Sequence, residues 1–400
     1  MRAVLLESIH PVAAKLLADA GWEVEVWDRS ATTDELKKLV TDAELLGIRS
    51  GTQLTHEVLA EADKLLAVGA FCIGTNQIDL TAAASRGIAV FNAPFSNTRS
   101  VVELALSEII ALTRRLTVKN DLMHTGTWDK SATGSHEVRG RRLGIVGYGN
   151  IGTQLSVLAE NLGMQVSFYD TADKLALSNA QRCNDLDELL GTVDVVTLHV
   201  DGRAGNKGFF GEDEFARMRP GALFLNLSRG FVVDQDALRR HLVSGHLAGA
   251  ALDVFSTEPA GRGDPFESPL RGIPNVILTP HVGGSTEEAQ ADIGQFVARK
   301  LLDFAGGGNT SLSVNMPAVQ PSASEAMHRL IHIHRNTPGV LATINQLMAE
   351  QGLNIEAQHL GTRGDVGFVV TDVASDFSDS ILERLRALPE TLRLRVLTAE

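Results

Sequence analysis

The stretch "RRLGIVGYGNIGTQLSVLAENLGMQVSFYD", residues 141–170, decides the fold of its part of the chain. An apolar strand pattern leads into a G-x-G-x-x-G turn, a helical pattern follows, and a second strand pattern ends on Asp170. This order is the signature of a dinucleotide-binding βαβ unit, whose glycines let a pyrophosphate approach the N-terminus of the helix. The sequence therefore predicts that a dinucleotide contacts Gly147, Gly149, Asn150, Ile151 and Gly152.

Asp170 indicates which dinucleotide binds. A carboxylate at the end of the second strand can accept hydrogen bonds from ribose hydroxyls, and it repels a 2′-phosphate. Residues 171–173 supply no cation to offset that charge, so NAD is favoured over NADP as cofactor. The alternative is a structural βαβ turn that binds no ligand.

Composition narrows the class of protein. The 400 residues exceed one small core and suggest two or three domains. A net charge of −13 argues against general nucleic-acid binding. Two cysteines, Cys72 and Cys183, are too few for a disulfide framework or a zinc ribbon, so we expect a reducing compartment and no metal site. No apolar run reaches the length of a signal core or a membrane span, so we expect a cytoplasmic protein with no membrane partner.

The first 300 residues alternate short apolar runs with helical stretches, which is the βα order of α/β proteins with parallel sheets. The predicted strands are 3–7, 23–27, 45–49, 65–71, 88–92, 193–200, 222–228, 247–255 and 275–280. Ser100 and Glu103 form a capping-box pattern, and we expect them to begin a long helix that leads from a first lobe into a second.

The last 75 residues follow a different pattern. A Gly/Ser/Pro-rich stretch precedes six elements in the order βαββαβ, which is typical of a ferredoxin-like unit. We interpret residues 326–400 as a separate domain behind a flexible linker, 319–325.

Three polar residues each follow a predicted strand of the nucleotide lobe. They are Arg229, Glu258 and His281. Ligands of open parallel sheets bind outside the carboxyl ends of the strands, so all three are expected near a bound nicotinamide. An arginine can hold a carboxylate, a histidine can exchange the proton that accompanies hydride transfer, and a glutamate can favour the imidazolium. Each residue taken singly is also compatible with an ordinary surface role.

The motifs "GYGNIG", "NLSRGFVVDQDAL", "LAGAALDVFSTEP" and "TPHVGGST" resemble those of the D-isomer-specific 2-hydroxyacid dehydrogenases. "FCIGTNQIDL", "FNAPFSNTRSV" and "HIHRNTPGVL" extend the resemblance over nearly the whole chain, to members with a C-terminal ACT domain. The resemblance implies two Rossmann-like lobes, with an NAD lobe (98–283) inserted into a discontinuous substrate lobe (1–97 and 284–318), and an ACT domain at 326–400. The two lobes would close over the substrate and exclude water.

The resemblance also implies residue roles. Arg229 would bind the substrate carboxylate, while Glu258 would support His281 as acid/base. His199, Ser228, Asp253, Gly283 and Gly284 would add to the cofactor site. Arg49, Ser50, Ile73, Gly74 and Asn97 would add to the substrate site.

The implied reaction is NAD-dependent oxidation of 3-phospho-D-glycerate to 3-phosphohydroxypyruvate, the first step of L-serine biosynthesis, with reduction of 2-oxoglutarate as a side activity. The implied regulation is feedback inhibition by L-serine at His334, Asn336 and Asn354, in a homo-oligomer (a dimer or a homotetramer). His332, on the same strand face as His334, is expected to be an ordinary solvent-facing residue.

One position departs from the expected pattern. The resemblance leads us to expect an R-S-R sequence for the substrate phosphate, but the chain has Arg49-Ser50-Gly51. Lys130, or else Arg139 or Arg141, could supply the missing charge, and we therefore add Lys130 to the predicted substrate-binding residues. Two alternatives therefore stay open: a dehydrogenase of another small D-2-hydroxy acid, and an NAD-sensing binding protein of the corepressor kind.

Overall fold

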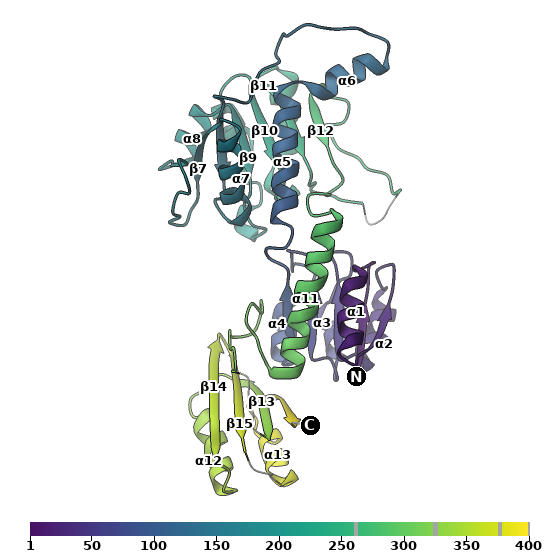
Figure 1. Cartoon of the computed structure of the whole chain (residues 1–400), viewed down its shortest axis with the longest axis vertical. Coiled ribbons are helices and arrows are strands. Elements are labelled where there is room, and N and C mark those ends of the chain that lie inside the picture. The colour runs from purple at the N-terminus through teal and green to yellow at the C-terminus, as the bar shows by residue number, and fades with distance from the viewer. Residues whose placement is uncertain (260–262, 323–326, 375–377, 399–400) are drawn as a thin grey trace. The chain divides into compact units, whose positions relative to one another are not determined.

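The computed structural model describes residues 1–259, 263–322, 327–374 and 378–398. By packing, the chain forms two compact units, one made of residues 1–96 with 290–400 and the other of residues 97–289 (Figure 1). Residues 323–325 of the predicted linker lie outside the described residues. In the described ranges, no helix combines the length and the hydropathy that crossing a lipid bilayer requires.

The first unit contains a five-stranded parallel sheet with the strand order β2-β1-β3-β4-β5. Its strands are β1 (Arg2–Leu5), β2 (Glu23–Val26), β3 (Leu45–Ile48), β4 (Ala67–Ala70) and β5 (Ala89–Asn92). One face packs against α1 (Pro11–Asp19) and α11 (Glu287–Gly307), as Figure 1 shows. The other face packs against α2 (Thr33–Asp42), α3 (His56–Ala60) and α4 (Leu80–Ser85). Because helices cover both faces, β3, β4 and β5 consist of buried residues throughout.

The tail forms the predicted ferredoxin-like unit. Its elements are β13 (His328–Arg335), α12 (Val340–Glu350), β14 (Ile355–Arg363), β15 (Val366–Val373), α13 (Asp379–Arg386) and β16 (Thr391–Thr398). They form an antiparallel sheet with the order β14-β15-β13-β16. Leu330 faces the two helices, while Ile331 and Ile333 share a core with Phe304 of α11.

Arginines of the tail fix it to the end of α11. Arg395 donates to the Ala305 carbonyl at 2.6 Å, and Arg329 donates to the Gly307 carbonyl at 3.1 Å. The last carbonyls of a helix have no partner within the helix, so these contacts satisfy groups that would otherwise stay unpaired. Arg329 is itself held by Asp372 at 2.7 Å. The tail is therefore packed on the first lobe as part of one unit.

The second unit contains a seven-stranded parallel sheet with the order β12-β11-β10-β9-β6-β7-β8. Its strands are β6 (Arg142–Val146), β7 (Gln165–Tyr169), β8 (Gln181–Arg182), β9 (Val195–Leu198), β10 (Ala222–Asn226), β11 (Leu247–Leu252) and β12 (Val276–Leu278). The helices α5 (Thr98–Thr113) and α7 (Asn150–Asn161) cover one face (Figure 1). The helices α8 (Leu186–Thr192), α9 (Glu212–Arg217) and α10 (Gln235–Val243) cover the other. The strand order reverses between β6 and β9, where open parallel sheets bind their ligands.

The predicted capping box at Ser100 is wrong. The helix α5 begins at Thr98, and its N-cap Asn97 makes no side-chain capping bond. The Ser100 hydroxyl instead lies 2.8 Å from the Thr286 hydroxyl, so it joins the start of α5 to the segment before α11. A contact with a residue 186 positions away replaced the local one that the pattern indicated.

Candidate active site

The glycine-rich turn has the shape that a dinucleotide requires. A Cβ on Gly147, whose φ is 93°, would lie 2.6 Å from the His199 carbonyl oxygen, and one on Gly152 would lie 2.4 Å from the Gly147 oxygen. A Cβ on Gly149 would have no neighbour within 4 Å. The first and third glycines therefore allow close packing, while the space in front of the second is free for a pyrophosphate at the start of α7.

Asp170 is fixed at the carboxyl end of β7. Its two oxygens accept hydrogen bonds from the Tyr148 and Ala172 amides, both at 2.8 Å. These bonds orient the carboxylate beside the glycine turn, where ribose hydroxyls are expected. Arg203 lies close enough to feel the Asp170 charge, but its guanidinium already pairs with Asp201 at 2.6 Å.

His281 and Glu258 form the predicted pair. His281 Nδ1 lies 2.8 Å from Glu258 Oε2, and the other Glu258 oxygen accepts the Phe255 amide at 3.0 Å. The hydrogen bond to Glu258 raises the pKa of His281 above its usual value, although burial opposes the rise. Burial also acts to raise the pKa of Glu258, but the bonds from His281 and Phe255 outweigh it and the pKa is lowered. The pair therefore favours an imidazolium beside a carboxylate, with Nε2 left for a substrate.

A buried carboxylate holds the backbone of the His281 loop. Asp253 is 2% exposed, and it accepts hydrogen bonds from the Thr279 hydroxyl at 2.6 Å and the Val282 and Gly283 amides at 2.8 Å. His281 itself has a φ of 54°, a left-handed conformation that non-glycine residues rarely adopt. The Asp253 bonds on both sides of it offset that strain. The sequence predicted Asp253 near the nicotinamide and gave no sign of this supporting role.

Asn226 is a residue that sequence reasoning missed. It ends β10 with no exposed surface, and its side chain accepts from the Ser228 amide and hydroxyl and donates to the Arg229 carbonyl. These bonds shape the turn that carries Arg229, whose positive charge acts on both Glu258 and His281. The sequence feature that could have pointed to this role is that a polar residue, Asn226, ends the otherwise apolar run "ALFLN".

Other predicted residues of this unit lie at the same edge. Ser228 is buried against Asn226, and Gly284 is so close to Asn97 that a Cβ would lie 2.5 Å from its amide nitrogen. His199 bonds Thr197 at 3.0 Å, and burial lowers its pKa to about 4, so its ring is neutral. Its backbone oxygen packs against Gly147, and this contact is how it shapes the cofactor turn.

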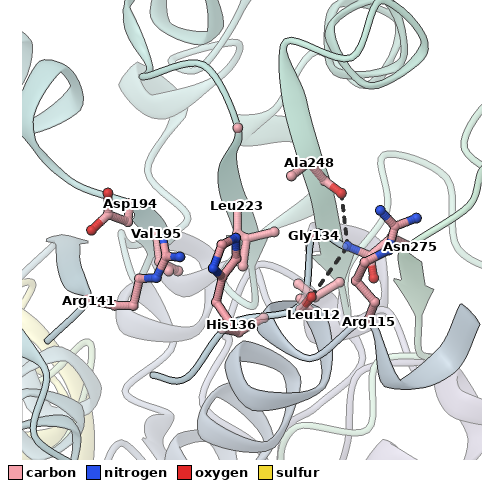
Figure 2. A pocket seen from close by; sticks show the side chains of 12 residues that line it. Leu112, Arg115, Gly134, His136, Arg141, Asp194, Val195, Leu223, Ala248 and Asn275 are labelled. Atoms are coloured by element: carbon pink, nitrogen blue, oxygen red, sulfur yellow. Dashed lines mark hydrogen bonds between the residues drawn. The ribbon is translucent and has the colours of Figure 1, made fainter. Parts of the chain in front are cut away.

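Two of the cations suggested to replace the missing arginine, Lys130 and Arg141, lie elsewhere. Lys130 lies over the Trp128 ring, on the segment after α6 (Leu116–His124). The helix α6 follows the C-terminal end of α5, whereas Asn97 lies at the N-terminal end of α5. Arg141 precedes β6 and lines a cavity of about 240 Å³ at the amino ends of the strands, together with Arg115 and Asn275 (Figure 2). Within one chain, therefore, neither Lys130 nor Arg141 joins His281, because they lie at the opposite edge of the sheet.

The remaining substrate residues belong to the first unit. Arg49 and Ser50 follow β3, while Ile73 and Gly74 follow β4, so both loops extend from the carboxyl edge of the five-stranded sheet. No residue in the described ranges pairs with the Arg49 guanidinium through an ion pair or hydrogen bond, which leaves that charge free for a ligand.

The three predicted serine-binding residues do not meet within one chain. His334 and Asn336 lie at the end of β13. In the sheet, His334 pairs with Gly367 of β15, and Gly367 pairs with Thr362 of β14, so this end of β13 is level with the end of β14. Asn354 precedes Ile355, which is level with His328 at the other end of β13. The separation is roughly 20 Å by strand rise. His332 is buried, bonded to Thr391 at 2.7 Å, so the expectation that it faces solvent is wrong.

Comparison with known proteins identifies the family. Residues 106–283 match the profile of the D-isomer specific 2-hydroxyacid dehydrogenase NAD binding domain. A D-3-phosphoglycerate dehydrogenase of Haemophilus influenzae is 50% identical over 398 residues, covering 99% of this chain and 97% of that protein. The chain belongs to the D-isomer-specific 2-hydroxyacid dehydrogenase family. The enzyme of the same name from Escherichia coli K12 is 50% identical over 403 residues, with the same two coverages.

Solved structures agree with this family. The TT0316 protein from Thermus thermophilus has a TM-score of 0.72 at 30% identity, covering 78% of this chain and all of its own. D-lactate dehydrogenase from Aquifex aeolicus, solved with NAD and lactic acid, has a TM-score of 0.68 at 25% identity, covering 80% of this chain and all of its own. Residues 330–393 match the AHAS small subunit-like ACT domain. This member of the dehydrogenase family thus uses NAD and carries an ACT domain.

Proposed function

We propose that this chain oxidises 3-phospho-D-glycerate to 3-phosphohydroxypyruvate with NAD, the entry reaction of L-serine biosynthesis. The observation that carries the proposal is the His281–Glu258 pair, 2.8 Å apart, with the charge of Arg229 acting on both residues. Relatives that are 50% identical over nearly the whole chain, named D-3-phosphoglycerate dehydrogenases, support the choice of substrate.

Arg229, His281 and Glu258 each have a distinct role in this reaction. Arg229 holds the substrate carboxylate and polarises the neighbouring C2–O bond as it becomes a carbonyl. His281 Nε2 takes the proton of the 2-hydroxyl while the C2–H bond breaks. NAD, when held at the glycine turn, would supply the acceptor for the hydride. The C–O bond of the alcohol becomes a carbonyl, and the proton stays on His281 as an imidazolium that Glu258 stabilises. The reverse reaction returns the proton from His281.

A panel of substrates tests this proposal. NADH formation is measured with 3-phosphoglycerate, D-glycerate, D-lactate and D-2-hydroxyglutarate, each with NAD and with NADP. The proposal expects the highest kcat/KM for 3-phosphoglycerate with NAD. A higher value for an unphosphorylated acid would favour the second candidate, a dehydrogenase of another small D-2-hydroxy acid, which Gly51 supports because it removes one expected cation. No turnover with any acid would favour an NAD-sensing binding protein.

We also propose that L-serine inhibits the enzyme at a site shared by two chains. The edge strand β14 has a ladder partner on one side only within the described chain, and its Leu360 is exposed. Antiparallel pairing of β14 with the same strand of a second copy would cover this edge. It would also bring Asn354 of one copy level with Arg363 of the other, near that copy's His334 and Asn336. The Nε2 atom of His334 is buried and has no hydrogen-bond partner among the described residues, which supports a ligand role.

Mixed oligomers test the shared site. His334→Ala and Asn354→Ala should each abolish serine inhibition and leave uninhibited turnover nearly intact. Co-assembly of the two variants should restore part of the inhibition, because each mixed dimer regains one complete site. If inhibition persists in either pure variant, or fails to return in the mixture, the shared site is wrong. If millimolar serine does not inhibit the wild type, the regulatory proposal fails.

The assembly and compartment are proposals of the same kind. Exposed apolar side chains on and near α6, Leu116, Met123 and Trp128, support further contacts between copies in a homo-oligomer. Within the described residues, Cys72 and Cys183 form no disulfide, which suits the cytoplasm. Size-exclusion chromatography with light scattering measures the assembly directly.

A further inference from the structure

Glu7 and the loop 49–52 lie where the strand order of the five-stranded sheet reverses. The chain runs from β1 outward to β2 and then continues on the other side of β1 with β3. Glu7 follows β1, and the loop follows β3. Open parallel sheets bind ligands outside the carboxyl ends of the strands at such a reversal.

The Glu7 carboxylate binds this loop through three backbone amides. One oxygen accepts from Arg49 at 3.2 Å and Thr52 at 2.9 Å, and the other accepts from Gly51 at 2.8 Å. Glu7 and Ser8 both adopt left-handed conformations, with φ of 67° and 51°. Non-glycine residues adopt this region rarely, and consecutive cases need support from the surrounding structure.

Gln77 binds the same loop from the other side. It is 5% exposed, and its side-chain nitrogen donates to the Arg49 carbonyl at 2.9 Å and to the Gly74 carbonyl at 3.3 Å. The loop after β3 and the loop after β4 are therefore joined by one buried amide group.

We propose that Glu7 and Gln77 are positioning residues that hold loops 49–52 and 72–74 as one rigid edge for the phosphate-bearing end of the substrate. The inference rests on the proposed function, since it assigns that end to this edge. A cluster of backbone amides attracts anions. Because Glu7 already takes three amides of loop 49–52, the side chains of this loop are left to bind the phosphate. The chief one is the Arg49 guanidinium, which has no partner among the described residues.

Gly51 fits this arrangement. A Cβ at this position would lie 3.0 Å from Glu7 Oε2, closer than ordinary contact. Any larger residue here must therefore shift Glu7 or the loop. The position that lacks the expected arginine therefore lies directly against the positioning carboxylate.

Isosteric variants that invert hydrogen-bonding roles test the proposal. Glu7→Gln replaces one accepting oxygen with an NH₂ group that faces backbone N–H donors. Gln77→Glu replaces a donating NH₂ group with an oxygen that faces the Arg49 and Gly74 carbonyls. Each should lower kcat/KM for 3-phosphohydroxypyruvate relative to unphosphorylated hydroxypyruvate by about tenfold, through KM, with kcat within about threefold. The KM for NADH should not change, because the cofactor turn lies in the other unit.

Ser8→Ala is the matched control. Ser8 shares the left-handed turn, but among the described residues its side chain bonds only the Asp28 carbonyl. If Glu7→Gln and Gln77→Glu change the substrate ratio no more than Ser8→Ala does, the positioning role is wrong. Should Gln77→Glu fail to fold, Gln77→Met removes the same bonds without charge and is judged by the same ratio. A wild type that does not discriminate between the two substrates would overturn the proposed function instead.

Hydrogen exchange then tests the loop itself in the full-length chain. The amides of Gly51 and Thr52 should exchange slowly in the wild type and at least tenfold faster in Glu7→Gln. Equal exchange in the two proteins would overturn the positioning role.

Discussion

Glu258 Oε2 lies 2.8 Å from His281 Nδ1, so the imidazole is oriented and charged by a carboxylate that follows a different strand. The two residues come from the loops after β11 and β12, and only the parallel pairing of these strands brings them together. The remaining ring nitrogen of His281 is the group that can exchange a proton with a substrate.

His281→Ala should lower kcat by roughly 10²–10⁴-fold, the usual contribution of a positioned acid or base. NAD binding should persist, because the glycine turn and Asp170 do not contact His281. Steady-state kinetics together with NADH fluorescence titration measure the two effects. A variant with near-normal kcat would rule out His281 as the acid/base.

Glu258→Gln should move the pH profile of the oxidation reaction. Glu258 raises the pKa of His281, and the oxidation needs the neutral imidazole, so activity rises as pH passes through that pKa. Without the carboxylate the imidazolium is less favoured, and the acid limb of kcat/KM should shift to lower pH while the maximal rate falls. An unchanged limb would show that Glu258 does not set the titration of His281.

Asp170→Asn should weaken the preference for NAD over NADP. The change keeps an acceptor oxygen for the Tyr148 amide and removes the charge that repels a 2′-phosphate. We expect kcat/KM with NADP to rise on the order of tenfold, with a smaller change for NAD. Equal use of NAD and NADP by the wild type would show that Asp170 does not face the ribose.

Arg49→Ala should raise the KM for 3-phosphoglycerate far more than the KM for D-2-hydroxyglutarate. The reason is that Arg49 carries the only arginine charge in the sequence Arg49-Ser50-Gly51. Gly51→Arg should lower the KM for the phosphorylated acid only to the extent that Glu7 can shift, given the 3.0 Å approach of a Cβ. If neither variant distinguishes the two acids, the phosphate binds elsewhere.

Glu108→Gln should stabilise the protein increasingly as pH rises. Both Glu108 oxygens are buried and find no hydrogen-bond partner in the part of the chain that the structure describes. Burial, with a smaller effect of Asp253, raises the pKa of Glu108 to about 8. The unfolded chain loses this proton near its usual pKa of 4.5 while the folded chain keeps it, so stability falls between about pH 4.5 and pH 8. The variant should gain on the order of 1–3 kcal/mol at pH 8 relative to pH 5.

Urea denaturation at the two pH values measures this difference. Glu103→Gln, on the exposed side of the same helix, is the control and should show little pH-dependent gain. An equal effect of Glu108→Gln at pH 5 and pH 8 would contradict a raised pKa.

The sequence by itself determined the features that depend on local order. Neighbouring residues are enough to predict the glycine turn between two strands, the alternation of strands and helices, and the βαββαβ tail. The reason is that the periodicity and the turn signals of these elements depend on residues close together in sequence. The sequence also predicted that Arg229, Glu258 and His281 lie close together, because parallel strands place their carboxyl ends at one edge.

Only the tertiary structure decided which residues support these groups. Asp253 beneath the His281 loop, Asn226 beneath Arg229, and Glu7 and Gln77 around loop 49–52 act through contacts that are 2 to 45 positions apart in sequence. The same holds for Ser100, which bonds Thr286 instead of capping α5, and for Asn354, which the ladder places far from His334. A residue's type shows which bonds it can form, but the packing of distant strands decides which partner comes within 3 Å.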